Sequence, residues 1–201
     1  MNKEKPVIIA DPYPQTLERI FEAKTWERLS SMATIISSAD EHMSEEEFDS
    51  YLPQAIAIIG QTPMPKERLD KAVNLRVIFN VEGNFYQNID YKECFKRSIR
   101  VLNCGKVYAR PVAEMALAMA LDLTRGITWE HMRFTQGTER YVLDGNKNSR
   151  LLTNAKVGII GFGLLGRSLR PLLAPFNCPV KVYDPWLPSS VIEENNCTST
   201  T

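Results

Sequence analysis

Residues 156–185 read KVGIIGFGLLGRSLRPLLAPFNCPVKVYDP, and this stretch decides the fold of the second half of the chain. It opens with an apolar, β-branched run, Lys156–Ile160, which predicts a strand. Three glycines in the spacing GxGxxG follow directly, and leucines at helical spacing come after them. A second apolar run, Pro179–Tyr183, predicts another strand, and Asp184 stands at its end. The order is therefore strand, glycine-rich turn, helix, strand and acid.

Each glycine of the motif has a physical task. Gly161 permits a tight turn out of the strand, Gly163 leaves room for a pyrophosphate, and Gly166 allows the helix to pack closely. The first helical residues, Leu164 and Leu165, present backbone N–H groups and a partial positive charge to phosphates. The motif therefore predicts that these five residues bind a dinucleotide.

The acid at the end of the second strand indicates which dinucleotide is bound. Asp184 would accept hydrogen bonds from the adenosine ribose hydroxyls, with Pro185 beside it, and its charge would repel a 2′-phosphate. NAD is therefore the predicted cofactor. A glycine turn without a ligand remains an alternative, whereas a kinase loop would need a valine where Ser168 stands.

The first hundred residues alternate short apolar runs with helical patterns. Continuous apolar strands of this kind predict a parallel sheet with helices on both faces, and so an α/β fold. The predicted strands are Val7–Ala10, Ala33–Ser37, Ala55–Gly60, Arg76–Val81 and Ile99–Asn103.

Capping signals and apolar spacing place the helices. Ser44 with Glu47, and Asp90 with Glu93, have the capping-box spacing that opens a helix. The other predicted helices are Gln15–Lys24, Pro65–Val73 and Pro111–Arg125, and Pro171 is expected to kink or shorten the helix of the glycine motif. Residues 126–154 are expected to form a connector with a helical turn or more, and residues 191–201 to fray.

Composition excludes several classes of function. The 201 residues carry 24 basic and 24 acidic side chains, without the dense positive charge that nucleic acids require. The run Val7–Ala10 is too short for a signal peptide, and Met115–Leu121 is too short for a membrane span. Four cysteines without CxxC spacing favour neither a metal site nor disulfides. We therefore expect a cytoplasmic protein with free thiols and no nucleic-acid or membrane partner.

Three stretches together resemble the D-isomer-specific 2-hydroxyacid dehydrogenases, the family of phosphoglycerate and formate dehydrogenases. They are VEGNFYQNIDY at Val81–Tyr91, VLNCGKVYARPVAEMALAMALDLTRG at Val101–Gly126, and the glycine-motif stretch up to Pro185. The resemblance implies a flavodoxin-like substrate domain at residues 1–103. It implies a Rossmann NAD-binding domain at residues 104–201, truncated after its second strand.

The resemblance also implies a substrate site. Backbone N–H groups of Gly83, Asn84 and Phe85 would hold the substrate carboxylate, and Asn84 would also lie near the nicotinamide. An ordinary strand-to-helix turn is the alternative for this loop. Two features depart from the family pattern, since Phe85 stands where glycine is common and Glu82 places an acid beside the carboxylate site.

By resemblance, the function is hydride transfer between NAD(H) and a small 2-hydroxy or 2-oxo acid, and the full-length form is expected to be a homodimer. The family uses an Arg, a Glu and a His for this chemistry, and no residue here matches those motifs. Neither His42 nor His131 is expected to act in catalysis, and His42 is expected at the surface. We therefore assign no catalytic residue and expect this chain alone to be inactive.

It would be the N-terminal part of a longer dehydrogenase or the product of a truncated gene. A non-catalytic NAD-binding or regulatory protein, and a product without function, remain alternatives.

Overall fold

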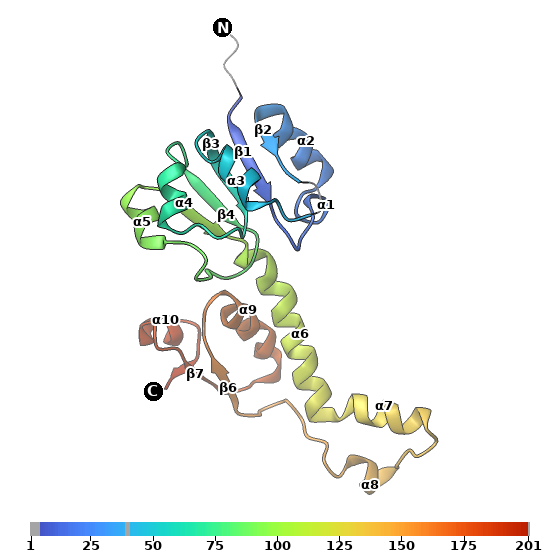
Figure 1. The fold of residues 1–201 in the computed structure, drawn as a ribbon. Coiled ribbons are helices and arrows are strands. Elements are labelled where there is room, and N and C mark those ends of the chain that lie inside the picture. The colour runs from blue at the N-terminus through green and yellow to red at the C-terminus, as the bar shows by residue number, and fades with distance from the viewer. Residues whose placement is uncertain (1–4, 39–40, 201) are drawn as a thin grey trace. The chain divides into compact units, whose positions relative to one another are not determined.

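The computed structural model describes residues 5–38 and 41–200 of the chain. The chain divides into two compact units, unit 1 (Met1–Gly105) and unit 2 (Lys106–Thr201). Each unit has a parallel sheet with its own helices (Figure 1). The α/β fold predicted from the sequence is therefore confirmed.

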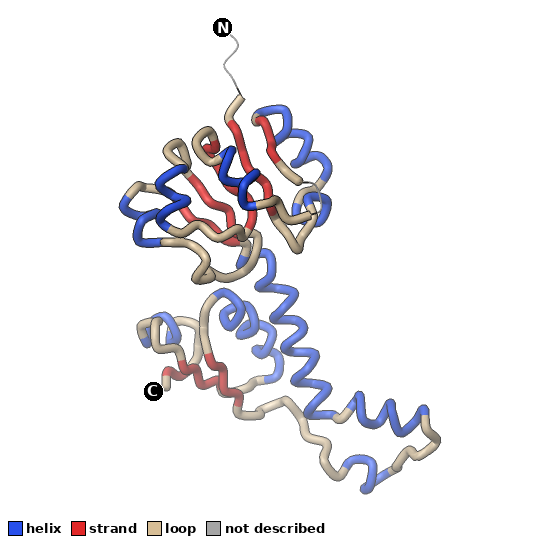
Figure 2. The backbone as a smooth tube through the Cα atoms, in the orientation of Figure 1, coloured by secondary structure: helices blue, strands red, loops and turns tan. Residues whose placement is uncertain are grey.

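Unit 1 is built on a five-stranded sheet with the order β2-β1-β3-β4-β5 (red strands in the upper part of Figure 2). All neighbouring strands are parallel. Each of the five predicted strands is confirmed, with ends that differ by at most a residue. The strands are β1 (Val7–Asp11), β2 (Thr34–Ile36), β3 (Ala55–Gly60), β4 (Val77–Asn80) and β5 (Arg100–Asn103).

Helices cover both faces of this sheet, because alternate residues of its strands point to opposite sides. Ile9, Ile58 and Ile78 pack with apolar residues of α3, α4 and α5 on one face. Ile8 and Ala57 pack with α1 and α2 on the other. These helices are α1 (Leu17–Ile20), α2 (Ala23–Met32), α3 (Glu45–Tyr51), α4 (Lys66–Lys71) and α5 (Tyr91–Lys96).

In both predicted capping boxes, the side chain of the N-cap residue accepts the expected hydrogen bond from a backbone N–H of the first helical turn. The Ser44 hydroxyl accepts a hydrogen bond from the Glu47 N–H at 3.3 Å. The Asp90 carboxylate accepts one from the Glu93 N–H at 2.9 Å. These bonds satisfy amide groups that a helix leaves unpaired in its first turn, and so they fix where α3 and α5 begin.

The single helix predicted at Gln15–Lys24 is wrong. The chain leaves α1 at Phe21, whose backbone is extended, and α2 begins at Ala23. The break lets the partly buried Phe21 pack against the apolar core of this face, and its ring lies 5.5 Å from that of Trp26 between centroids. Core packing has overridden a continuous helical pattern.

Unit 2 begins with three helices and ends with a three-stranded parallel sheet of order β6-β7-β8. The two predicted strands and the helix of the glycine motif are confirmed. The elements are α6 (Gly105–Arg125), α7 (Ile127–Thr135), α8 (Val142–Asn146), β6 (Val157–Ile160), α9 (Leu164–Leu173), a 3₁₀ turn (Ala174–Phe176), β7 (Val180–Tyr183), α10 (Ser189–Glu193) and β8 (Thr198–Ser199).

Both prolines with a predicted effect lie inside helices. The helix expected to begin at Pro111 begins at Gly105 instead, where the Asn103 carboxamide oxygen accepts the Gly105 N–H at 3.0 Å. Pro171 lies inside α9, which ends two residues later and passes into the 3₁₀ turn. Proline removes one helical hydrogen bond, and the shortened end of α9 agrees with that effect.

The tail predicted to fray is ordered over its described residues. Ile192 of α10 is fully buried, and Cys197 is buried beside it in the core of unit 2. Strand β8 then adds to β7 as a third strand, where the sequence predicted only two. The reason is that Ile192 and Cys197 are apolar groups within an otherwise polar stretch, and their burial holds the segment down.

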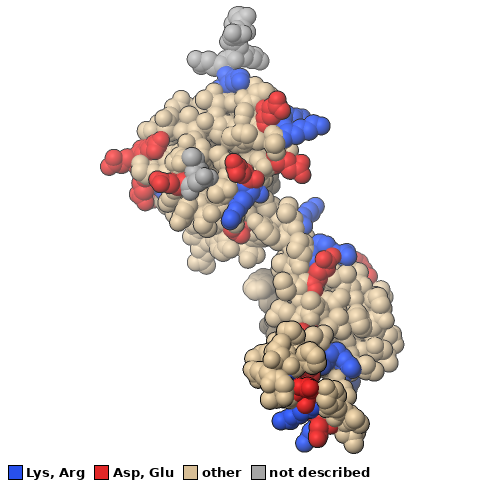
Figure 3. Space-filling view, turned by 90° about the vertical axis from the view of Figure 1, so that its right-hand side faces the viewer, with Lys and Arg blue, Asp and Glu red and all other residues tan. Residues whose placement is uncertain are grey.

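Other features of the described residues concern membranes, metals and charge. No described helix is both long and apolar enough to cross a membrane. Among the described residues no cluster of three metal-ligating side chains occurs, and the four cysteines are free. Burial raises the pKa of the Cys94 thiol to about 11, which keeps it protonated and unreactive. Acidic and basic side chains are interspersed on the face drawn in Figure 3.

Candidate functional site

The glycine turn of unit 2 joins the end of β6 to the start of α9. Gly161 has a φ of +83°, in the left-handed region that residues with a side chain rarely adopt. Its N–H donates to the carbonyl of Tyr183 at 2.8 Å, which ties the turn to the end of β7. The first glycine therefore makes the turn that the sequence predicts.

The other two glycines differ in what surrounds them. A Cβ on Gly166 would stand 2.6 Å from the Gly161 carbonyl oxygen and 3.3 Å from the Phe162 ring, so only glycine fits there. A Cβ on Gly163 would meet no atom of the described residues within 4 Å. Internal packing therefore explains Gly166, whereas Gly163 faces open space of the kind that a close-lying ligand would use.

The N-terminus of α9 provides donors toward the same space. Gly163 is the N-cap of α9, and Leu164, Leu165 and Gly166 form its first turn. A helix provides no internal acceptor for N–H groups in its first turn, and its dipole makes this end partially positive. The arrangement suits an anion such as a pyrophosphate.

Asp184 follows β7 and lies beside the turn. One carboxylate oxygen accepts the Phe162 N–H at 2.7 Å, and the other accepts the N–H groups of Trp186 at 3.0 Å and Leu187 at 3.1 Å. These bonds, that of Phe162 first, hold the pKa of the Asp184 carboxyl below its ordinary value. Pro185, which has no N–H, occupies the turn that they close. The acid is thus ionised and fixed next to the glycine turn.

The predicted substrate loop follows β4 in unit 1. Its support is Asn80, a fully buried residue that the sequence analysis did not single out. The Asn80 side chain donates to the Asn84 carbonyl at 3.0 Å and accepts the Glu82 N–H at 3.1 Å, so it spans the loop at Gly83. Phe85 is exposed, with its ring edge-on to that of Tyr91.

The structure brings the cofactor residues Gly161, Gly163, Leu164, Leu165, Gly166, Asp184 and Pro185 together in unit 2, and the substrate residues Gly83, Asn84 and Phe85 in unit 1. The role of Asn84 toward the nicotinamide stays a prediction, because it joins residues of different units.

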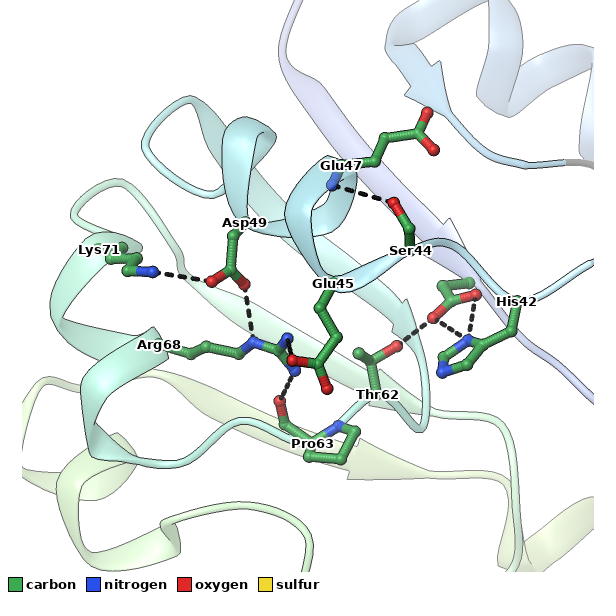
Figure 4. A network of polar contacts seen from close by, with 10 residues as sticks. His42, Ser44, Glu45, Glu47, Asp49, Thr62, Pro63, Arg68 and Lys71 are labelled. Atoms are coloured by element: carbon green, nitrogen blue, oxygen red, sulfur yellow. Dashed lines mark hydrogen bonds and ion pairs between the residues drawn. The ribbon is translucent and has the colours of Figure 1, made fainter.

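A second polar cluster at the end of β1 was missed (Figure 4). The Asp11 carboxylate is 1% exposed and accepts the Met43 N–H at 3.1 Å and the Thr62 hydroxyl. His42 Nδ1 lies 3.0 Å and 2.9 Å from its two oxygens. His42 was predicted at the surface, and its side chain is 53% exposed, but it is anchored to a buried acid. No local sequence signal joins residues 31 positions apart, so the pair could not be found by motif.

The contacts of Asp49, Arg68 and Lys71 in Figure 4 stabilise the packing of α3 against α4. Arg68 donates to Asp49 at 2.7 Å and to the Pro63 carbonyl at 3.0 Å, and Lys71 donates to Asp49 at 2.8 Å. Burial alone would raise the pKa of Asp49, but the hydrogen bonds from Lys71 and Arg68 outweigh it and lower the pKa. This network joins the two helices.

Comparison with known proteins agrees with these features. Residues 117–201 match the model of the D-isomer specific 2-hydroxyacid dehydrogenase NAD binding domain. Hydroxypyruvate reductase of Thermotoga maritima is 26% identical over 153 residues, which cover 75% of this chain and 48% of that protein. The chain therefore spans about half the length of this curated relative.

Solved structures extend the likeness to nearly the whole chain. A phosphoglycerate oxidoreductase from Rhizobium etli is 39% identical with a TM-score of 0.78, over 98% of this chain and 60% of that one. An NAD-dependent formate dehydrogenase from Staphylococcus aureus in complex with NAD is 26% identical with a TM-score of 0.60, over 90% and 56%. By its NAD-domain match and by a fold shared along nearly its full length, the chain is similar to the D-isomer specific 2-hydroxyacid dehydrogenase family.

Proposed function

We propose that the chain is part of an NAD-dependent oxidoreductase that transfers hydride between NAD(H) and a small 2-hydroxy or 2-oxo acid. The observation that carries the proposal is the glycine turn, where Gly163 leaves open space at the N-terminus of α9 and a fixed, ionised Asp184 lies beside it. The family's NAD-binding domain supports a nicotinamide cofactor. The Staphylococcus relative, whose structure contains NAD, supports NAD itself.

In this proposal the cofactor is held from two sides. The first-turn N–H groups of α9, at Leu164 and Leu165, bind the pyrophosphate, and Asp184 accepts from the ribose hydroxyls. Each oxygen of a carboxylate has two acceptor sites. Oδ1 of Asp184 already accepts from Trp186 and Leu187, whereas Oδ2 accepts only from Phe162 and keeps one site for a ribose hydroxyl. Pro185 keeps the backbone beside the ribose free of a competing donor. When bound, NAD supplies the hydride acceptor.

The substrate carboxylate is assigned to the N–H groups of Gly83, Asn84 and Phe85. The Asn80 carboxamide holds this loop through both its nitrogen and its oxygen. The loop is therefore already ordered and loses less conformational entropy when substrate binds. The substrate class follows from the relatives, one of which is named a hydroxypyruvate reductase.

We propose further that the 201 residues bind cofactor without turning substrate over. Reduction of a 2-oxo acid needs a proton donor placed at the keto oxygen, and general acid catalysis of this kind contributes about 10²–10⁴-fold. The family's Arg, Glu and His have no match in this sequence. A regulatory, NAD-binding role for this chain would have the same binding behaviour.

Isothermal titration of the chain with NADH and NADPH tests the proposal. NADH should bind more tightly than NADPH, and Asp184→Asn should reduce that preference by about tenfold because a charge-assisted hydrogen bond is lost. NADH oxidation with hydroxypyruvate should stay at background. Absence of NADH binding by the folded chain, or an unchanged preference in the variant, contradicts the proposed site.

The proposed full-length partner is a second copy of the chain. Exposed apolar side chains follow one another along α6, α7 and α8, and we call this the α6–α8 surface. Exposed apolar side chains are common at protein–protein interfaces, and homodimer interfaces are more apolar than the rest of the protein surface. The residues include Met115, Met119, Leu123, Trp129, Phe134 and Leu143.

A further inference from the structure

Trp186, in the turn between β7 and α10, has a side chain that the packing of unit 2 does not use. The residue is 87% exposed, more than any other aromatic residue that the structure describes. Among the described residues, its hydrogen bond is made by its backbone N–H, and its indole pairs with no other aromatic ring. The packing of unit 2 therefore explains neither the size nor the aromatic character of this residue.

The backbone that carries this exposed ring is nevertheless fixed. The N–H groups of Trp186 and Leu187 donate to the same oxygen of Asp184, at 3.0 Å and 3.1 Å. The Leu187 side chain packs against the core of unit 2, and Pro185 and Pro188, whose φ angles are locked, flank the two residues. A ligand on the indole would therefore order little more than two side-chain torsions, which keeps the entropy cost of binding low.

The turn holds the indole next to the proposed ribose acceptor. In the proposed function, Asp184 accepts from the hydroxyls of the adenosine ribose, and the base is joined to the sugar carbon beside the one that bears the 2′-hydroxyl. The phosphate is joined at the other end of the sugar. A pyrophosphate at the N-terminus of α9 therefore leaves the base on the Asp184 side of the site, where Trp186 follows two residues later.

The chemistry of the indole suits a nucleobase. Adenine is planar, aromatic and uncharged, so the ionised Asp184 does not repel it, and bases stack on tryptophan through their π-faces. A protein partner would bury a contiguous apolar patch. Trp186 is instead followed after Pro188 by the exposed, polar Ser189 and Ser190.

We propose that Trp186 is a further cofactor-binding residue, whose indole stacks on the adenine ring of the dinucleotide while Asp184 binds the ribose. The adenosine half of the cofactor is then recognised by the single turn that follows β7. ADP-ribose, which carries this half, should bind through Trp186, whereas nicotinamide mononucleotide should not reach it. This inference rests on the proposed function, since it assumes that the ribose binds at Asp184.

Isothermal titration of the 201-residue chain with ADP-ribose tests the proposal. Trp186→Ala should bind about tenfold more weakly, as the loss of one stacked base predicts, with an unchanged melting temperature because the side chain is exposed. Trp186→Phe keeps an aromatic face and should recover most of the affinity. Leu151→Ala is the matched control, since it truncates another exposed apolar residue of unit 2 and should bind as the unaltered chain does.

Tryptophan fluorescence reports the contact itself. The chain has three tryptophans, so Trp26→Phe combined with Trp129→Phe leaves Trp186 as the sole emitter. ADP-ribose should quench its emission saturably, with the dissociation constant found by titration. Nicotinamide mononucleotide, which lacks adenine, should leave the emission unchanged.

The outcomes separate this inference from the proposed function. Unchanged ADP-ribose affinity in Trp186→Ala, alongside weaker binding by Asp184→Asn, overturns the role of Trp186 and leaves the glycine-turn site intact. Equal losses in Trp186→Ala and Leu151→Ala also overturn it. A change in Trp186 emission with protein concentration alone assigns the residue to a contact between copies and contradicts stacking on adenine. Binding of neither ADP-ribose nor NADH by the folded, unaltered chain overturns the proposed cofactor site itself.

Discussion

Gly163 is the residue whose surroundings distinguish ligand binding from internal packing. Because a Cβ there meets no described atom within 4 Å, Gly163→Val should fold normally but block a pyrophosphate. We expect loss of NADH binding in a titration with little change in thermal stability. Gly158→Val is the matched control, since it also adds a side chain into open space, on β6 but away from the turn. Equal NADH affinity of the two variants would place the cofactor elsewhere.

Asp184 makes a prediction about pH. Its folded-state pKa is lowered by the Phe162, Trp186 and Leu187 N–H groups, so its contribution to stability is present above the unfolded pKa of about 3.9. That contribution is lost as the pH falls through the lower folded-state value. Asp184→Asn should therefore be less stable than the unaltered chain at pH 7, and the difference in melting temperature should shrink below about pH 4. A difference that grows toward acid pH would contradict this.

The cofactor residues could be predicted from the sequence because they lie close together along the chain. The turn, the helix N-terminus and the acid lie within thirty residues, and each residue type is required by its own backbone position. Asn80 and the Asp11–His42 pair could not be found in this way. Their contacts arise where strand order brings distant segments to one edge, and nothing in the spacing of residues 11 and 42 records that.

At the scale of elements, α10 and β8 carry the clearest stability prediction. Ile192 is fully buried in the core of unit 2, so Ile192→Ala should destabilise that unit by about 2–5 kcal/mol. Hydrogen exchange of the β7 amides would measure the loss. Ile160→Ala is the control, because Ile160 is 88% exposed and its truncation should leave exchange nearly unchanged. Similar exchange in both variants would mean that the tail does not pack as described.

Elements were predictable where their signals are local. Apolar runs located the strands, and Ser44 and Asp90 located two helix starts. The errors occurred where packing decides. Phe21 leaves α1 to pack against the core, α6 continues back across Pro111, and the burial of Ile192 orders a polar tail. None of these outcomes can be read from the propensity of the segment alone.

At the scale of the molecule, the α6–α8 surface predicts association. Met119→Glu places a charge within this apolar surface and should weaken the dimer without reaching the core, since Met119 is 57% exposed. Sedimentation equilibrium would show a lower apparent mass than for the unaltered protein at equal concentration. Val73→Glu is the control, because Val73 is 73% exposed in unit 1 and is not one of the residues of the α6–α8 surface. Equal dimer dissociation constants for the two variants would mean that the interface lies on another surface.

The most direct test of the central claim is a map of backbone amide shifts on titration of the 201-residue chain with NAD. Saturable shifts are expected at Gly161–Gly166 and at Trp186 and Leu187, whose N–H groups donate to Asp184. Saturable shifts confined to other residues, or no shift in a chain whose spectrum shows it to be folded, would contradict the claim that the glycine turn binds the dinucleotide.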